Sequence, residues 1–165
     1  MKKVLFAIVF IAAILSAYAA GQQEDATQTD AYADYMSWTK VNQETITGDV
    51  TGALGPAHQS AKGFREIFVN DIGRPTAYGE TAYPYPAGSI ILKESYKAKD
   101  GDKGALDGFT IMIKRENGYD ADNGNWEYVM TNTDFKVSQQ GKIGMCIGCH
   151  SAGSDKDFTF WDSSM

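Results

Sequence analysis

Two stretches, Ser89-Ile-Ile-Leu-Lys-Glu-Ser-Tyr96 and Phe109-Thr-Ile-Met-Ile-Lys114, set the fold class of this 165-residue chain. β-branched and aromatic residues dominate both stretches, and such residues favour an extended backbone. A loop rich in Gly, Asp and Lys, running from Lys99 to Gly108, separates them at the spacing of a hairpin. The sequence therefore predicts two antiparallel strands here.

The same pattern continues on both sides of this pair. Phe64-Arg-Glu-Ile-Phe-Val69 precedes it, and Trp126-Glu-Tyr-Val-Met-Thr131 follows it after a turn from Asp120 to Asn125. That turn resembles a calcium-binding loop, but Thr131 stands where an EF-hand loop requires glutamate, which favours a plain turn. No helical stretch between the strands is long enough for a parallel crossover. We therefore predict an antiparallel sheet of about four to five strands.

Helical elements are expected at the two ends of the domain. From Asp30 to Val41, the side chains of Tyr32, Tyr35 and Met36 recur along one side at helical spacing, and Asp30 is placed to cap the helix. Near the C-terminus we expect a helical turn. The predicted fold class is α+β and sheet-dominated, with an N-terminal helix and this C-terminal helical turn.

The first residues have the features of an export signal. Met1-Lys2-Lys3 is basic, Val4 to Leu15 is apolar and uncharged, and Ser16-Ala17-Tyr18-Ala19 offers small residues for cleavage. We predict a signal peptide over residues 1–19, a flexible leader over 20–29 and a single domain over 30–165, in an exported or periplasmic protein. The alternative is an uncleaved anchor, but the apolar run is shorter than the ~20 residues that span a membrane.

The charge of the chain bears on its partners. The formal net charge is −6, and removal of Lys2 and Lys3 with the signal leaves a still more acidic protein. An acidic surface without a basic stripe argues against nucleic acid and anionic membranes. We therefore expect neither nucleic acid nor, after signal cleavage, a membrane as a partner.

Cys146-Ile-Gly-Cys149-His150 matches the Cys-x-x-Cys-His signature of covalent haem attachment. Two thiols three residues apart lie close together on a helical turn, where each can add to a haem vinyl group. The adjacent His150 then projects toward the iron as the proximal ligand. The sequence predicts one covalently bound haem c, with His150 as its metal ligand.

Other uses of the two cysteines stay open. A zinc site would need about four ligands, and His58 is the only other candidate nitrogen. A thioredoxin-type pair would follow an early strand of a βαβ unit rather than lie near the C-terminus of an antiparallel chain. A plain disulfide between Cys146 and Cys149 is the remaining alternative.

The position of the motif bears on the sixth ligand of the iron. Only fifteen residues follow His150, and the sole methionine among them is the terminal Met165. A sixth ligand would have to come from upstream, where the candidates are His58, Met36, Met112 and Met130. Each of these candidates can also be an ordinary loop or core residue, so we favour an open sixth position. An open iron binds small molecules, whereas a closed one mainly moves electrons.

The chain resembles the cytochrome P-460 family, which includes cytochrome c′-beta, from about Tyr35 to Phe160. The resemblance is carried by the order and spacing of four segments. These are Phe64-Arg-Glu-Ile-Phe-Val-Asn70, Tyr85-Pro-Ala-Gly-Ser-Ile-Ile-Leu-Lys-Glu94, Gly124-Asn-Trp126 and the Cys-x-x-Cys-His motif followed by Asp157-Phe-Thr159. It implies a sheet-dominated haem pocket, often in a homodimer, and reactions with hydroxylamine or nitric oxide.

The resemblance also implies roles for two cations. Lys93 stands where the P-460 enzymes have a lysine cross-linked to the haem edge, and it shares a strand face with Ile91. Related cytochromes without the cross-link share much of this segment, so both states remain open. Arg65 matches an arginine near the distal pocket and shares a face with Ile67, where it would meet a haem propionate or a bound ligand; a salt bridge at the strand's end is the alternative.

One departure from the family concerns the distal carboxylate that hydroxylamine-oxidising members use for proton transfer. That position falls at Thr110, with Met112 next on the same face, and neither side chain is a general base. An apolar distal pocket is favoured instead, in which Phe64 or Phe109 would cap the iron. Asp107 is a further residue that could reach in from its loop.

Four functions are therefore compared. The first is a cytochrome that binds or senses small ligands such as nitric oxide, and the second is an oxidoreductase of hydroxylamine or a related compound, with Lys93 and Arg65 as its candidate catalytic residues. The third is a six-coordinate electron carrier that meets a redox partner cytochrome. The fourth is a haem-free exported module held by a disulfide. Enzymatic activity stays undecided from the sequence.

Overall fold

The structure, a computed structural model, describes residues 31–47 and 64–160. The predicted signal peptide over 1–19, the leader over 20–29, Asp30 and His58 lie outside the described residues. The chain divides into two units, Met1–Asp34 and Tyr35–Met165, and the elements below belong to the second. Within the described residues, no helix is both long and apolar enough to cross a membrane.

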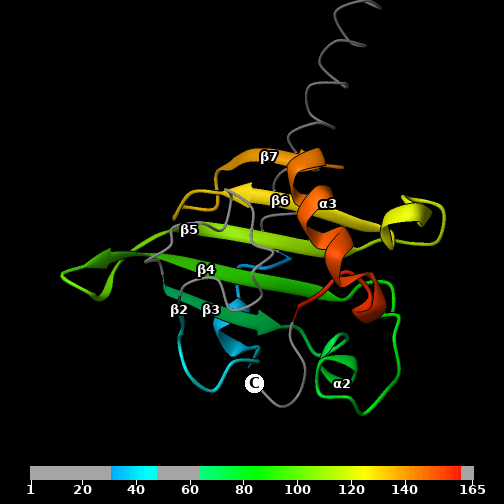
Figure 1. The fold of residues 1–165 in the computed structure, drawn as a ribbon, viewed down its shortest axis with the longest axis horizontal. Helices are drawn as coiled ribbons and strands as arrows, with labels where there is room; N and C mark the ends of the chain where they lie inside the picture. Colours follow the sequence, from blue (N-terminus) through cyan, green and yellow to red (C-terminus); the bar gives the residue numbers. More distant parts are fainter. Residues whose placement is uncertain (1–30, 48–63, 161–165) are drawn as a thin grey trace, which may run out of the picture. The chain divides into compact units, whose positions relative to one another are not determined.

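An antiparallel sheet dominates this unit, as predicted, and it has seven strands rather than four or five (Figure 1). Its strand order is β1-β3-β4-β5-β6-β7, with β2 also pairing with β3, and every pairing is antiparallel. The additional strands are short edge segments. The strands are β1 (Thr39–Lys40), β2 (Ile46–Thr47), β3 (Phe64–Val69), β4 (Ile90–Lys99), β5 (Asp102–Lys114), β6 (Trp126–Thr131) and β7 (Val137–Gly141).

The loop predicted from Lys99 to Gly108 is mostly strand. β4 and β5 meet in a two-residue turn at Asp100 and Gly101, whose φ angles are 54° and 92°. Two consecutive positive φ values match the twist of a tight hairpin, and Asp-Gly is a favoured pair for it. The polar residues that follow the turn are therefore carried in β5 instead of forming a loop.

The helix expected over Asp30 to Val41 is wrong. The described part of that stretch contains turns, a three-residue 3-10 helix η1 (Tyr35–Ser37) and then β1, whose Thr39 pairs with Val69 of β3. Pairing with the sheet edge overrides the local helical pattern. The other helical elements are α2 (Arg74–Ala77), η2 (Ala121–Asn123), α3 (Gly144–His150) and η3 (Ser151–Lys156).

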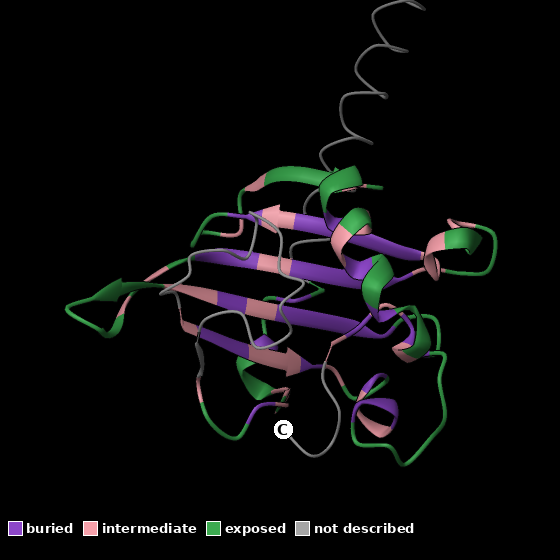
Figure 2. Ribbon diagram, viewed as in Figure 1, coloured by how far each residue is buried: buried purple, intermediate pink, exposed green. Residues whose placement is uncertain are grey.

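Side chains alternate between two faces of the sheet, and the two faces have different covers. We call the face that α3 crosses in Figure 1 the near face and the opposite one the far face. The near face carries an apolar cluster that includes Cys146 of α3. The buried stretches of the central strands that support the cluster are purple in Figure 2. Its buried members are Val69, Ala77, Tyr85, Ile91, Met112, Trp126, Tyr128 and Cys146.

The far face is covered by aromatic residues. The Tyr35 ring of η1 packs edge-on against Phe68 and Phe109, at centroid distances of 5.3 and 5.4 Å. Phe135 stacks on Phe109 at 4.3 Å. The Tyr35 hydroxyl donates to the buried carboxylate of Glu94 at 2.6 Å. These contacts fix which residues of the strands point away from α3.

A second buried carboxylate, Glu66, lies among hydrogen-bond donors on the far face. Lys40 and Lys103 place their ammonium groups 2.7 and 2.9 Å from its oxygens. The side chains of Thr45 and Asn42 donate to it at 2.6 and 2.9 Å. Burial acts to raise the pKa of Glu66, but these hydrogen bonds outweigh it and lower the pKa to about 2.

Glu66 is expected to make stability fall in acid. Because its pKa is lowered in the folded chain, its contribution is complete above the unfolded value of about 4.3 and is lost as the pH falls toward 2. The difference in free energy of unfolding between wild type and Glu66→Gln should be on the order of 3 kcal/mol at pH 7 and shrink between pH 5 and 2. Urea unfolding across that range checks this, and a constant difference would contradict it.

Candidate functional site

The Cys-x-x-Cys-His motif forms the C-terminal part of α3, as the predicted helical turn requires. The Cys146 side chain is buried in the near-face cluster and Cys149, three residues later, is half-buried. Both thiols are free, so the alternative of a disulfide between them is not formed in this structure. Burial raises the pKa of the Cys146 thiol, and the positive charge of Lys93 acts in the opposite direction.

The imidazole of His150 is buried and held in one orientation. Its Nδ1 lies 2.6 Å from the carbonyl oxygen of Phe158, to which it donates in the neutral form. The ring also packs against Tyr128 and Phe160, at centroid distances of 5.3 and 5.2 Å. Burial lowers the pKa of His150, although the bond to Phe158 acts against this. When Nδ1 donates to a carbonyl, Nε2 is the nitrogen through which the ring would bind a metal.

The carbonyl that orients His150 belongs to a tight loop. Asp157 and Phe158 both have left-handed backbone, with φ of 51° and 65°, which is unusual for a bulky residue such as Phe. The Phe158 amide donates to the carbonyl of Gly153 at 2.7 Å, closing the loop. Gly153 is buried, and a Cβ placed there would clash with the carbonyl oxygen of Thr159. The loop therefore has no room for a larger residue at this point.

A buried ion pair fastens this loop to the sheet. Lys114, the last residue of β5, places its Nζ 2.7 and 2.6 Å from the two carboxylate oxygens of Asp157. The Asp157 carboxylate also accepts the Tyr85 amide at 2.8 Å, and its carbonyl accepts the indole N–H of Trp126 at 2.8 Å. The loop that contains Asp157 and Phe158 is thus bonded to β5, β6 and the segment before β4.

Two further cations lie on the near face, as the strand alternation predicted. Arg65 is buried, and Lys93 pairs across β3 and β4 with Ile67, a member of the apolar layer. Burial and the nearby charge of Arg65 lower the pKa of Lys93 to about 7. The charge of Lys93 also acts on Cys146 and His150, which places all four groups on one side of the sheet.

The register separates these cations from the strand carboxylates. Thr110 lies opposite Lys93 in the β4–β5 ladder and opposite Met130 in the β5–β6 ladder. By alternation, Glu66, Glu94 and Glu127 fall on the far face of β3, β4 and β6. The near face therefore carries no carboxylate in the paired parts of these strands. The described residues to which this applies are 64–69, 90–95, 109–114 and 126–131.

The aromatic caps proposed for the iron are wrong. Phe109 points to the far face, where it packs with Tyr35 and Phe135, and Phe64 alternates to the same face as Phe68. A one-residue difference in strand position exchanges the faces, so these rings are directed away from α3. Asp107 does not reach in either: it is exposed and pairs with Lys97 at 3.1 Å.

The possible sixth ligands are distributed unevenly. Met36 has 78% of its surface exposed, which removes it from the near face, whereas Met112 is buried in the cluster with Cys146. Met130 alternates to the near face beside Thr110. His58 and Met165 lie outside the described residues.

The near face fits a haem group. It offers two thiols one helical turn apart, an imidazole oriented through its Nδ1, an apolar layer for the ring and two cations for its propionates. Over residues 31–47 and 64–160, no group of three or more His, Cys, Asp or Glu side chains could hold a bare metal ion, so the zinc alternative has no ligand set there. The fold and site together define a haem-binding cytochrome.

The family follows from sequence comparison. The family profile of cytochrome P-460 matches residues 32–161, and the chain belongs to this family. No curated protein matches the chain. Membership confirms the resemblance stated above and carries haem binding with it.

Sequence reasoning missed three residues of the site: Lys114, Asp157 and Tyr128. Lys114 shares the near face with Met112 by alternation, so a buried cation seeking a partner could have been inferred from the strand pattern. Asp157 lies 43 residues further along the chain, and only the fold brings it to Lys114. Tyr128 looked like an ordinary core residue of β6.

Proposed function

We propose that this protein is an exported mono-haem c-type cytochrome that binds or redox-transforms small nitrogen ligands, such as nitric oxide or hydroxylamine, at an open distal position. The proposal rests on the gathering of Cys146, His150, Arg65 and Lys93 on one apolar sheet face. Haem supplies the iron chemistry. The chain supplies the thioether anchors, the oriented imidazole and the positive charge around the site.

The polar residues of the near face bear on which reaction the site would support. Arg65 places positive charge in a buried setting, which stabilises propionates and any anionic ligand, and Lys93, with its pKa lowered to about 7, adds charge when it is protonated. Thr110 occupies the family's carboxylate position and has no basic group. Binding of a nitrogen ligand is therefore favoured over proton-coupled oxidation of hydroxylamine.

A six-coordinate periplasmic electron-transfer cytochrome is the second candidate. The observation that favours it is Met112, whose thioether side chain is buried in the cluster that contains Cys146. A methionine ligand would close the iron and leave electron transfer to a partner cytochrome as the main activity. Low-spin ferric haem in the wild type that becomes high-spin in Met112→Leu would favour this candidate.

Covalent attachment of one haem is tested on protein matured in a bacterial periplasm. Wild type should gain the mass of a single haem under denaturing conditions, while Cys146→Ser/Cys149→Ser should lose it because no thioether can form. Met145→Leu, a change at the exposed neighbour in α3, is the matched control and should keep the haem. Wild-type protein without a Soret band would contradict the proposal and leave a haem-free module.

The reaction is tested on the same haem-loaded protein. High-spin haem that binds nitric oxide without hydroxylamine turnover supports the binding function, and turnover supports the oxidoreductase. A ferrous Soret band shifted far to the red, absent from Lys93→Arg, would show the lysine cross-link. Sedimentation measurements test the homodimer that the family resemblance implies. N-terminal sequencing of the mature protein tests export, because a cleaved chain lacks Lys2 and Lys3.

A further inference from the structure

The hydroxyl of Tyr128 is a buried polar group with no hydrogen-bond partner among the described residues. The side chain is fully buried, so water from the surface does not reach it. Buried hydroxyls are nearly always hydrogen-bonded, because an unpaired one loses its bonds to water without replacement. A partner is therefore expected in the functional protein.

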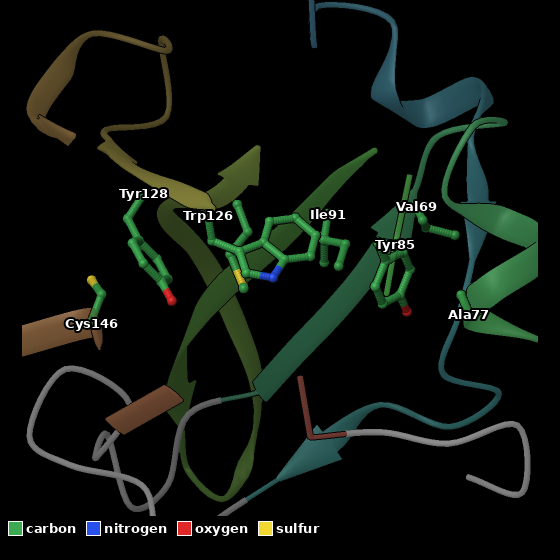
Figure 3. Packing of buried hydrophobic residues seen from close by; sticks show 8 residues of the cluster. Val69, Ala77, Tyr85, Ile91, Trp126, Tyr128 and Cys146 are labelled. Atoms are coloured by element: carbon green, nitrogen blue, oxygen red, sulfur yellow. The ribbon is translucent and has the colours of Figure 1, made fainter. Parts of the chain in front are cut away.

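The surroundings of Tyr128 indicate where that partner lies. Its ring packs against His150 at 5.3 Å and belongs to the near-face cluster with Cys146. Figure 3 shows Tyr128 extending from β6 toward the helix segment that carries Cys146. The Tyr128 ring thus packs against His150 and shares a cluster with Cys146, two of the three residues that would hold the haem.

A comparison with Tyr35 supports this interpretation. Tyr35 is also buried, but on the far face, and its hydroxyl donates to Glu94 at 2.6 Å. The Tyr35 phenol therefore has its hydrogen-bond partner within the chain, on the face where no cofactor is expected. At Tyr128 the ring is packed and the hydroxyl is left for a group that arrives later.

We propose that the Tyr128 hydroxyl is a hydrogen-bond donor to the occupied haem pocket, accepted by an oxygen of a haem propionate or of a ligand bound to the iron. The inference rests on the haem binding proposed above. Both acceptors share the same chemistry, an oxygen with partial or full negative charge. Tyr128 is then a binding residue of the pocket, beside the proximal His150.

Asp120 offers the competing explanation. One of its carboxylate oxygens, Oδ2, is also buried without a hydrogen-bond partner among the described residues. Its other oxygen accepts from Asn123 at 3.1 Å within the turn before β6. A water shared by Tyr128 and Asp120 would satisfy both groups without haem, and the test must separate this arrangement from the proposal.

The experiment compares Tyr128→Phe with Tyr35→Phe in the full-length, haem-loaded protein. Each variant removes one buried hydroxyl and keeps the ring, so packing is preserved in both. The measurements are the midpoint potential of the iron, the dissociation rate of nitric oxide, the N–O stretching frequency and the Tm. Asp120→Asn is measured in parallel.

The expected results differ between the variants. If a propionate is the acceptor, Tyr128→Phe lowers the midpoint potential, because a less compensated carboxylate favours ferric iron. If a bound ligand is the acceptor, nitric oxide dissociates about tenfold faster, as the loss of one hydrogen bond predicts. Tyr35→Phe should lower the Tm and leave potential, dissociation rate and N–O frequency unchanged.

Two outcomes would overturn the proposal. The first is a Tyr128→Phe protein whose potential, nitric oxide dissociation and N–O frequency equal those of wild type. The second is an effect on Tm alone that Asp120→Asn reproduces, which assigns the hydroxyl to a shared water. Wild type without haem is a different failure, because it removes the proposed function itself.

Discussion

Replacing Asp157 with Asn is expected to lower the free energy of unfolding of the haem-loaded protein by about 3–5 kcal/mol. The change leaves the ammonium of Lys114 buried without its counter-charge, and the side chains of both residues are less than a tenth exposed. Asn keeps an acceptor for the Tyr85 amide and tolerates the left-handed backbone of this position, whose φ is 51°. The fall in the free energy of unfolding therefore measures the effect of removing the charge alone.

The matched control is Asp107→Asn, which breaks the ion pair with Lys97. Both partners of that pair are more than half exposed, and exposed pairs contribute about 0–1 kcal/mol. A double variant, Lys114→Met/Asp157→Asn, should be less destabilised than Asp157→Asn alone, because it removes the unpaired charge. Urea unfolding measures all three, and equal losses for Asp107→Asn and Asp157→Asn would refute the buried pair as an anchor.

Gly153→Ala is expected to destabilise the protein by about 3 kcal/mol and to disturb the environment of His150. The new Cβ would clash with the carbonyl oxygen of Thr159, and a backbone atom cannot move away as the end of a flexible side chain does. The Gly153 carbonyl also accepts the Phe158 amide at 2.7 Å. Movement of the backbone at Gly153 or at Thr159 would shift the Phe158 carbonyl that accepts from His150.

Gly144→Ala provides the comparison for Gly153→Ala. A Cβ at Gly144, the first residue of α3, meets no atom within 4 Å. Alanine favours the helix by about 1 kcal/mol over glycine, so this variant should be neutral or slightly stabilised. Unfolding measurements and the ferric haem spectrum are the checks. A Gly153→Ala protein with wild-type stability and spectrum would show that the loop adapts freely.

The strands could be predicted well because their signals are local. Composition and alternation were sufficient to place β3 and β6 at Phe64–Val69 and Trp126–Thr131, with the same bounds as in the structure. The stretch after Asp30 was misread because its helical spacing competes with pairing to the edge of β3, and pairing depends on residues far along the chain. The local sequence pattern alone does not predict whether such a stretch forms a helix or pairs with a strand.

The site could be predicted in part for the same reason. The motif at Cys146, Cys149 and His150 is local. The resemblance to the P-460 family pointed to Lys93 and Arg65, and alternation put both on the apolar face of their strands. Naming an aromatic cap failed because neighbouring residues of one strand face opposite ways. The Lys114–Asp157 pair was missed because its partners meet only in the folded chain.

The hydrogen bond from His150 to the carbonyl of Phe158 makes one property of the site resistant to mutation. A main-chain carbonyl is present whatever residue occupies position 158, so no substitution there deletes the acceptor. Sequence drift at this position can change the side chain of residue 158 while leaving the acceptor for the imidazole in place. The orientation of the imidazole is thereby independent of which side chain stands at position 158, and is sensitive only to changes that displace the loop.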